Sequence, residues 1–258
     1  ESVLQIAPNA AAAYSLRSLT GGDPKVVRVR RDTDGGAGDN DEQDFTASGI
    51  SSGALVAFVG SGNDGFVETW YDQSGNSEDA VQETAGSQPK IVNAGSLVVL
   101  SGVPALLFDE SFLVATGFAF SPSGDFLAVT VSKISTGNLI DTRDGGSDGF
   151  FIQQGGSDFR YRYNGDGSID VSGNDQHIVA TAELNGTTLT AYKNSSSAGT
   201  DTVTAGLSTT TALSIGKVAF SSANAVSGSV QEIILYDTDK SANRATLETD
   251  IISHYGIS

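Results

Sequence analysis

Residues 176–194, QHIVATAELNGTTLTAYKN, carry the clearest fold signal in this sequence. Two short runs rich in Val, Ile, Leu, Thr and Tyr flank Asn185-Gly186, the dipeptide that most strongly favours a two-residue β-hairpin turn. The stretch therefore predicts two antiparallel strands joined at this turn. A second Asn-Gly pair, Asn164-Gly165, follows the run DFRYRYN and predicts another hairpin.

The same pattern of short apolar runs between Gly, Ser, Asn and Asp continues through most of the chain. Predicted strands cover residues 25–31, 65–72, 96–100, 103–108, 112–116, 125–134, 137–142, 149–154, 158–164, 176–184, 187–194, 212–220 and 229–237. Two antiparallel sheets packed face to face bury this many strands without long exposed edges. We therefore predict an all-β protein, a jelly-roll β-sandwich of two antiparallel sheets, forming a single domain over residues 1–258.

Three short helices are expected at the periphery. Asn9 and the following alanines predict a helix over residues 10–19, and Ser51 or Ser52 with Gly60 predicts one over residues 51–60. Near the end of the chain, residues 247, 251 and 255 place apolar side chains on one helical face. Ser241 can cap that helix, and Gly256 can end it.

The charge balance excludes some partners. The 258 residues include 31 acidic and 14 basic ones, so the net charge is −17. Because nucleic-acid binding depends on Lys and Arg contacts to phosphates, we expect no nucleic-acid partner. No apolar run approaches the length that crosses a bilayer, so we expect no membrane insertion.

Cysteine and histidine chemistry is not expected either. The chain has no Cys, which excludes disulfides and a cysteine nucleophile. Its two histidines, His177 and His254, lie far apart in sequence and lack a third partner at ligand spacing. They indicate neither a zinc site nor a Ser-His-Asp triad.

An acidic segment, DTDGGAGDNDEQD at residues 32–44, invites two interpretations. Hard cations prefer oxygen ligands, so Asp32, Asp34, Asp39 and Asp41 are candidate calcium ligands. The spacing departs from the EF-hand pattern, and the alternative is a solvated acidic loop. Calcium is the one candidate cofactor that the sequence suggests.

The segment TWYDQSGN, residues 69–76, holds the single tryptophan beside an acid and a turn. Trp70 and Asp72 are candidate ligand contacts. Alternation along a strand places the rings of Trp70 and Tyr71 on opposite faces, so at most one faces a cleft. In the alternative interpretation Asp72 accepts backbone N–H bonds from Ser74 or Gly75 and the segment is purely structural.

The run DFRYRYN is the second candidate for recognition. Tyr161 and Tyr163 lie on one face of the predicted strand, and Arg160 and Arg162 lie on the other. Exposed tyrosines would stack on the apolar face of a sugar, and exposed arginines would bind carboxylates or sulfates. The alternative is that the rings fill the core while the arginines pair with surface acids.

Several short segments of the sequence, taken in order, resemble one enzyme family. They are AAYSLRSL (12–19), VVRVRR (26–31), GALVAFVG (53–60), WYDQSGNSEDA (70–80) and QPKIV (88–92). Together they resemble the catalytic domain of fungal-type α-L-arabinofuranosidases, related domains of which occur in environmental bacterial and phage proteins. The closing residues 228–257 resemble the last strand and helix of laminin G-type modules. The resemblance implies a concanavalin A-like jelly roll.

Catalysis in that family needs two carboxylates, one as nucleophile and one as proton donor. The resemblance places the nucleophile in residues 144–156, where Ile152, Gln153 and Gln154 stand in place of an acid. It places the proton donor in residues 215–233, which contain no acid before Glu232. The resemblance therefore implies that both positions are vacant.

Relocated carboxylates remain an alternative. Asp141 and Glu183 each end a predicted strand and form one conceivable replacement pair, and Asp144 and Asp148 are further candidates.

We therefore predict a non-catalytic module at an extracellular or virion surface. It would bind a glycan or cell-surface polysaccharide, or decorate a larger assembly by contacting other subunits. The first alternative is a glycoside hydrolase of the α-L-arabinofuranosidase type with relocated carboxylates. The second is a purely architectural subunit that packs against copies of itself.

Overall fold

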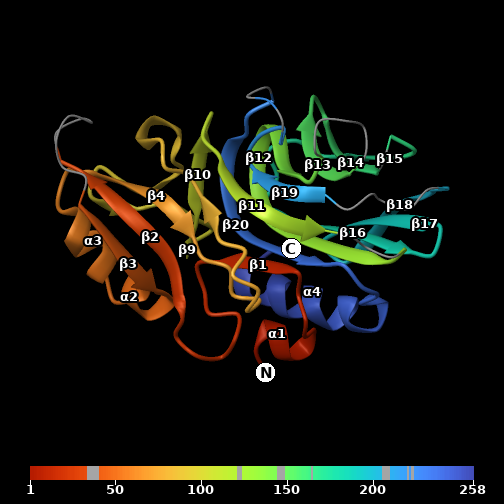
Figure 1. Cartoon of the computed structure of the whole chain (residues 1–258), viewed down its shortest axis with the longest axis horizontal. Coiled ribbons are helices and arrows are strands. Elements are labelled where there is room, and N and C mark those ends of the chain that lie inside the picture. The colour runs from red at the N-terminus through yellow and green to blue at the C-terminus, as the bar shows by residue number, and fades with distance from the viewer. Residues whose placement is uncertain are drawn as a thin grey trace.

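The structure is a computed structural model that describes residues 1–33, 41–120, 124–143, 149–163, 165–204, 210–219, 221 and 224–258 (Figure 1). Strands dominate it, and the helices are α1 (Val3–Ile6), α2 (Ala47–Ser51), α3 (Ala54–Val59) and α4 (Ser241–Tyr255), with a 3-10 turn at Ala85–Ser87. None of the helices in these ranges has the length and apolar character needed to span a membrane. The prediction of a mostly β protein with a few short helices is confirmed.

The strands follow the chain from near the N-terminus to Tyr236. They are β1 (Ala12–Ser15), β2 (Lys25–Asp32), β3 (Glu42–Thr46), β4 (Asp64–Trp70), β5 (Ala80–Val81), β6 (Lys90–Asn93), β7 (Ser96–Leu97), β8 (Val99–Leu100), β9 (Val103–Pro104), β10 (Leu106–Asp109), β11 (Leu113–Phe120), β12 (Phe126–Asp141), β13 (Phe150–Gly155), β14 (Asp158–Tyr163), β15 (Gly167–Ser172), β16 (Ile178–Asn185), β17 (Thr188–Lys193), β18 (Ser196–Thr202), β19 (Thr210–Ile215) and β20 (Ser227–Tyr236).

Hydrogen bonding links all of these strands except the β8–β9 hairpin into one sheet, within the residues described. The sheet closes on itself through the eight strands β20, β10, β6, β4, β5, β11, β19 and β12. The prediction of two separate antiparallel sheets therefore needs correction. The sheet is antiparallel and continuous, and it is closed as a barrel with additional strands.

Strand β12 is the physical reason for this continuity. Its first half pairs with β16 and β20, and its last residues pair with β13 and β19. The pairing register with β20 shifts between Ile134 and Thr136, where a bulge bends the strand. At the bend Gly137 has φ +99°, and a Cβ there would meet the carbonyl oxygen of Ala225 at 2.3 Å. One long strand thus passes from one layer to the other and joins them.

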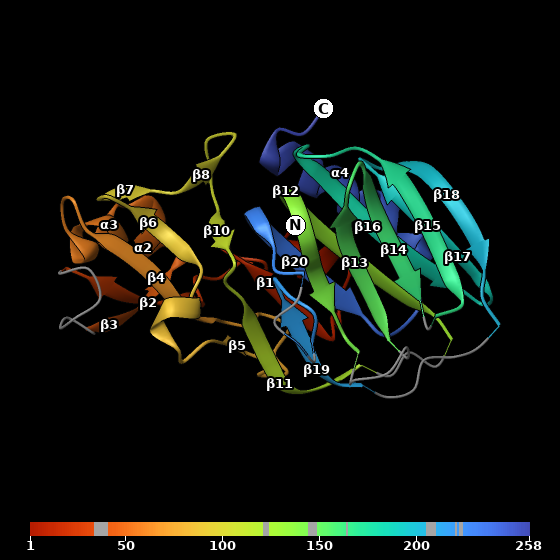
Figure 2. The same cartoon turned by 90° about the horizontal axis from the view of Figure 1, so that it is seen from above.

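Two regions lie side by side in the views from the front and from above (Figures 1 and 2). The N-terminal lobe consists of β2, β3, β4, β6 and β7 with helices α2 and α3. The β12–β18 region contains two facing layers, in which β15 contacts β17 and β18. Strands β10, β1 and β20 lie between the two regions (Figure 2).

The core has two parts. The larger cluster fills the lobe and the space between the layers, where Phe126 lies 4.8 Å from Phe150 and stacks on Tyr163 at 5.9 Å between ring centroids. The smaller cluster lies beneath α4, whose Leu247 and Ile251 pack with apolar residues of β12 and β20. The C-terminal helix predicted from this apolar spacing is confirmed, and Gly256 ends it at φ +61°.

The predictions for the other helices have different outcomes. The helix predicted over residues 51–60 is confirmed for α3, and α2 lies before it and shares only Ser51 with the predicted range. The helix predicted over residues 10–19 is wrong, because residues 12–15 form β1, which pairs with β20 and is fully buried. Alanine favours a helix, but the backbone hydrogen bonds and burial that β1 gains by pairing with β20 override this local preference. The hairpin predicted at Asn185-Gly186 is confirmed, with Asn185 paired to Thr188 around the turn.

Candidate functional site

The segment TWYDQSGN serves the fold. Trp70 is fully buried, with its ring 5.7 Å from that of Tyr14. Asp72 Oδ1 accepts the backbone N–H groups of Ala13 at 2.8 Å and Ser74 at 2.9 Å. The predicted ligand contact through Trp70 is wrong, because its ring is closed off by the core. Asp72 has its carboxylate engaged in the turn that the structural interpretation predicted.

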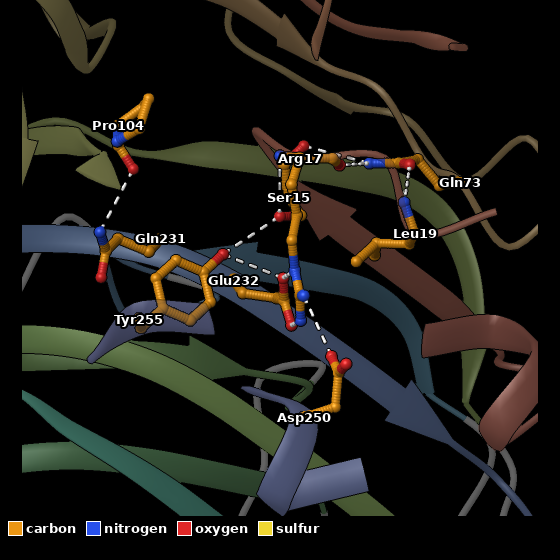
Figure 3. Close-up of polar contacts among 9 residues, drawn as sticks. All are labelled: Ser15, Arg17, Leu19, Gln73, Pro104, Gln231, Glu232, Asp250 and Tyr255. Atoms are coloured by element: carbon orange, nitrogen blue, oxygen red, sulfur yellow. Dashed lines mark hydrogen bonds and ion pairs between the residues drawn. The ribbon is translucent and has the colours of Figure 1, made fainter. Parts of the chain in front are cut away.

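Gln73 continues this role and leads to a buried polar network (Figure 3). Its Oε1 accepts the N–H of Leu19 at 2.8 Å, and its Nε2 donates to the carbonyls of Ser15 and Arg17 at 3.1 and 3.0 Å. Three bonds to one segment help to satisfy its backbone donors and acceptors. Gln73, which belongs to the arabinofuranosidase-like segment at residues 70–80, thus holds residues 15–19 in place.

At the centre of this network, Arg17 forms a two-point ion pair with Glu232 (Figure 3). Nε and Nη2 of Arg17 lie 2.8 and 3.1 Å from the two Glu232 oxygens, and Nη1 lies 3.0 Å from Asp250. The Tyr255 hydroxyl donates to Glu232 at 2.9 Å. Every Glu232 oxygen therefore already has a donor.

The pKa shifts fit a fixed ion pair. Burial acts to lower the pKa of the Arg17 guanidinium, but Glu232 outweighs this effect and raises it above its usual value. Burial and the charge of Glu232 raise the pKa of Tyr255. Both oxygens of Glu232 are thus bound by permanent donors, which suits a structural brace. Sequence reasoning gave no signal for this pair, since its members are 215 positions apart.

Strand β14 turns its rings inward. Tyr161 and Tyr163 are fully buried, and the Tyr161 hydroxyl donates to the Tyr192 carbonyl at 3.2 Å. Arg160 and Arg162 lie on the opposite face, where Arg162 pairs with Asp170 at 2.6 Å. The prediction that Tyr161 and Tyr163 stack on a ligand is wrong, because the facing layers cover both rings. The alternative stated for this strand is confirmed for the rings and for Arg162.

Among the described residues, neither the two segments that the arabinofuranosidase resemblance assigns to catalysis nor the replacement candidate Asp141 provides a free acid. Asp141 is fully buried and bound by Arg143 Nη2 at 2.5 Å and Asn138 Nδ2 at 2.9 Å. The Arg143 guanidinium stacks over the Phe151 ring at 3.9 Å. Gln154 is buried and donates to the Gly156 carbonyl. Asp144 and Asp148 lie outside the described residues.

The conceivable replacement pair Asp141 and Glu183 does not form. Glu183 pairs with Leu127 of β12, and Asp141 stands fourteen positions further along the same strand. Leu127 is the second residue of β12 and Asp141 is its last, so the two acids stand at opposite ends of this strand. Glu183 instead accepts the Tyr192 hydroxyl at 2.8 Å.

The acidic segment is described in part. Asp34 and Asp39 lie outside the described residues. Asp41 pairs with Arg31 at 2.7 Å, and Asp32 lies 3.9 Å from Arg30. Within the described ranges no three acids or histidines cluster as metal ligands. The predicted calcium site stays a prediction.

A different surface brings charged, aromatic and polar side chains together. Register pairing places Arg30 of β2 opposite Phe66 of β4, Phe66 opposite Lys90 of β6, and Lys90 opposite Leu107 of β10. Directly paired residues point to the same face of a sheet, so these four side chains form one row. They line a hollow of about 490 Å³, which also includes Asp32, Ala85, Gly86, Gln88, Asp109 and Ser111.

The cations of this row are held over the ring. Arg30 is only 5% exposed, its Nε donates to Gln88 Oε1 at 2.9 Å, and its guanidinium lies 4.9 Å from the centre of Phe66. Lys90 Nζ lies 5.4 Å from the same centre and 2.7 Å from Asp64. Burial acts to raise the pKa of Asp64, but bonds from the Ala94 N–H and Lys90 outweigh it and lower that pKa.

Two further hollows each share one lining residue with the first. One, of about 350 Å³, shares Asp32 and adds Thr33, Gly62, Asn63, Asp64, Asn93 and Ala94. The other, of about 580 Å³, shares Asp109 and adds Glu110, Thr136, Asn224, Ala225, Val226 and Ser227. We call the three together the cross-strand groove. Of its residues, only Asp32 was a sequence-predicted site residue, and no local signal marks Phe66, Gln88 or Lys90.

Comparison with known proteins shows likeness in structure alone. No family model and no curated protein match the chain. A GH54 α-L-arabinofuranosidase soaked with a cyclic sulfate inhibitor superposes with a TM-score of 0.72 at 12% identity. An arabinofuranosidase complexed with arabinofuranosyl-α-1,2-xylobiose does so at 0.68 and 14%. In both, 98% of this chain is covered and the chain spans 65% of the enzyme's length.

A third similar structure is not an arabinofuranosidase. It comes from work on the cell entry of botulinum neurotoxin type C, which depends on two ganglioside molecules. The TM-score is 0.54 at 14% identity, with 71% of this chain and 49% of the toxin chain covered. The resemblance to the arabinofuranosidase domain is therefore confirmed at the level of the fold.

Proposed function

We propose that this chain is a non-catalytic carbohydrate-binding module, with the cross-strand groove as its glycan site. The observation that carries the proposal is the row Arg30–Phe66–Lys90. It places an aromatic ring, two donors and the acids Asp32 and Asp109 in one hollow. Sugar sites combine an apolar surface with a few placed polar groups in this manner.

Two similar proteins support a glycan as the ligand. One was solved with arabinofuranosyl-α-1,2-xylobiose bound, and the other depends on gangliosides for cell entry. We extend glycan binding to this chain, together with a concanavalin A-like jelly roll that forms a single domain over residues 1–258. We place the module at an extracellular or virion surface, where it binds a cell-surface polysaccharide and contacts other subunits of its assembly.

A glycan array tests the proposal directly. The wild-type chain and Phe66→Ala are screened in parallel, with and without added calcium. We expect the wild type to bind a defined set of glycans and Phe66→Ala to lose at least tenfold in affinity. Calcium-dependent binding would support the predicted ion in the acidic segment. The matched control is Phe58→Ala, which removes a half-buried ring of the same lobe that packs on Phe45 and lies outside the groove.

Binding that survives in Phe66→Ala and fails in Phe58→Ala would move the site out of the groove. No binding to any glycan, combined with defined oligomers in light scattering, would favour the architectural alternative instead.

The second candidate function is hydrolysis by relocated carboxylates. One observation favours it: Asp32 and Asp109 line the same hollow. Release of the leaving group from an aryl α-L-arabinofuranoside measures this activity. A rate above background that disappears in both Asp32→Asn and Asp109→Asn would establish the enzyme. A rate equal to background in the wild type would leave the binding function.

A further inference from the structure

We infer that the cross-strand groove binds the interior of an extended, uncharged polysaccharide, lying across the strands rather than capturing a chain end or an acidic sugar. This inference rests on the proposed glycan-binding function and specifies the ligand class. It follows from the course of the groove and from the pairing of donors with acceptors along it.

The course of the groove is set by strand register. The row from Arg30 to Leu107 crosses β2, β4, β6 and β10. Asp109 then pairs with Ser227 of β20, and Ser227 pairs with Thr136 of β12. Six neighbouring strands at about 4.8 Å spacing extend over roughly 24 Å. Figure 2 shows these strands one after another from the lobe toward the β12–β18 region.

The central hollow shares Asp32 with one neighbouring hollow and Asp109 with another. The polar contacts of Lys90 connect the first two hollows, because its Nζ binds Asp64 and Asn93, at 2.7 and 3.1 Å, in the neighbouring one. A chain that occupies the centre can therefore continue in both directions. This arrangement fits the interior of a polymer rather than its terminus.

The charges in the centre are balanced. Arg30 and Lys90 supply hydrogen-bond donors to the hollow, and Asp32 and Asp109 supply carboxyl oxygens as acceptors. A sugar hydroxyl both donates and accepts, so neighbouring hydroxyls bridge a guanidinium and a carboxylate. An anionic sugar would instead meet two aspartates in a protein of net charge −17.

Arg30 has donor capacity left for this purpose. Among the described residues, its guanidinium has Gln88 as a hydrogen-bond partner and Asp32 as an ion-pair partner at 3.9 Å. Nη2 has neither kind of partner there, yet it is not among the buried unsatisfied atoms. Arg30 is itself one of the residues that line the hollow. Phe66 and Leu107 are half-buried beside it and offer the apolar faces that a sugar ring needs.

Isothermal titration with defined oligosaccharides tests the inference. The probes are neutral hexasaccharides of xylan, arabinan, mannan and β-glucan type, the corresponding monosaccharides, and an oligogalacturonate of six residues. We expect at least one neutral hexamer to bind, at least tenfold tighter than its monosaccharide, and no binding of the oligogalacturonate. Affinity should change less than about twofold between 50 and 500 mM salt, because no net charge is neutralised.

Variants locate the binding to the groove. Arg30→Ala and Asp109→Ala should each weaken the neutral hexamer at least tenfold. Arg28→Ala, on the same strand but paired with Glu42 outside the groove, is the matched control and should bind as the wild type does. Asp109 is exposed, so its variant folds even where the loss of nearly buried Arg30 disturbs the lobe.

The outcomes separate this inference from the proposed function. Groove-dependent binding of the oligogalacturonate, or equal affinity for monomer and hexamer, would overturn the inference and leave a glycan-binding module standing. No binding of any glycan would overturn both.

Discussion

Two rows of aromatic and cationic side chains distinguish the two regions of this molecule. In the β12–β18 region, β14 alternates rings and arginines in one continuous run, and both tyrosines are fully buried. In the N-terminal lobe, Arg30, Phe66 and Lys90 come from three strands, and their ring borders a surface hollow. The β14 row is contiguous in the sequence, and its rings belong to the core. The surface row comes from three separate strands and forms no contiguous pattern in the sequence.

The difference shows what alternation along a strand can decide. It separates two faces of a strand, but it does not say which face meets water. For β14 the facing layer decides: β15 and β18 contact each other across the interior, which leaves the rings covered and the arginines outside. For the lobe, neighbouring strands supply both the ring and the cations. A recognition surface built from several strands, as in the lobe, depends on the pairing register between those strands.

The largest expected effect is the difference in unfolding free energy between removing the Tyr163 ring and removing the Phe66 ring. Tyr163→Ala removes a fully buried ring that stacks on Phe126, so we expect the free energy of unfolding to fall by about 3–5 kcal/mol. Phe66→Ala removes a half-buried ring, and we expect a loss of about 1 kcal/mol or less. Urea denaturation followed by circular dichroism measures both. Equal losses would show that Phe66 is a core residue and not a groove residue.

The next effect compares a buried acid with a groove acid. Glu232→Gln leaves the charge of Arg17 without its main partner, and we expect a loss of about 3 kcal/mol in unfolding free energy. Asp109→Asn changes an exposed side chain and should stay within about 0.5 kcal/mol of the wild type. The same denaturation experiment applies. A stable Glu232→Gln variant would contradict the role of this ion pair as a brace.

A smaller effect tests whether the arginine face of β14 is a second recognition surface. The double variant Arg160→Ala, Arg162→Ala removes both outward cations, one of which pairs with Asp170. Because surface ion pairs contribute little, we expect unfolding free energy to change by less than about 1 kcal/mol. Affinity for the neutral hexamer should remain at the wild-type value. If this double variant lost binding, the glycan site would lie on the arginine face of β14 and not in the cross-strand groove.

The smallest effect is a dependence of stability on pH. Burial lowers the pKa of His177 and of His254, and Arg17 lowers that of His254 further. A folded-state pKa below the unfolded value of about 6.5 means that protons bind the unfolded chain more tightly. The stabilisation is therefore complete above about pH 6.5 and decreases as the pH falls through the lowered pKa.

Melting temperatures at pH 7.5 and 5.5 measure this dependence, and His254→Gln should reduce the difference. A higher melting temperature at pH 5.5 in the wild type would reverse the sign and contradict the assignment. Both histidines lie outside the cross-strand groove, so glycan affinity should not follow the same profile.

Local sequence patterns predicted much of the fold but little of the candidate site. Asn185-Gly186 and the apolar spacing of residues 247, 251 and 255 act over a few positions, and the structure confirms the hairpin and the helix. For residues 12–15 the local pattern predicted a helix and was wrong, because these residues pair with β20, more than 200 positions away in the sequence. Apart from Asp32, the groove residues were not predicted as a site, since Arg30 and Leu107 are brought together only through β4 and β6.

The sequence by itself determined that the chain builds short antiparallel strands with a closing helix, because turn chemistry and side-chain periodicity are properties of neighbouring residues. The tertiary structure alone decided which rings are buried, that the long β12 closes the sheet, and that Arg30, Phe66 and Lys90 share one surface. These features arise from register between distant strands. A shift of one residue in that register would turn each side chain to the other face, and no local pattern in the sequence fixes it.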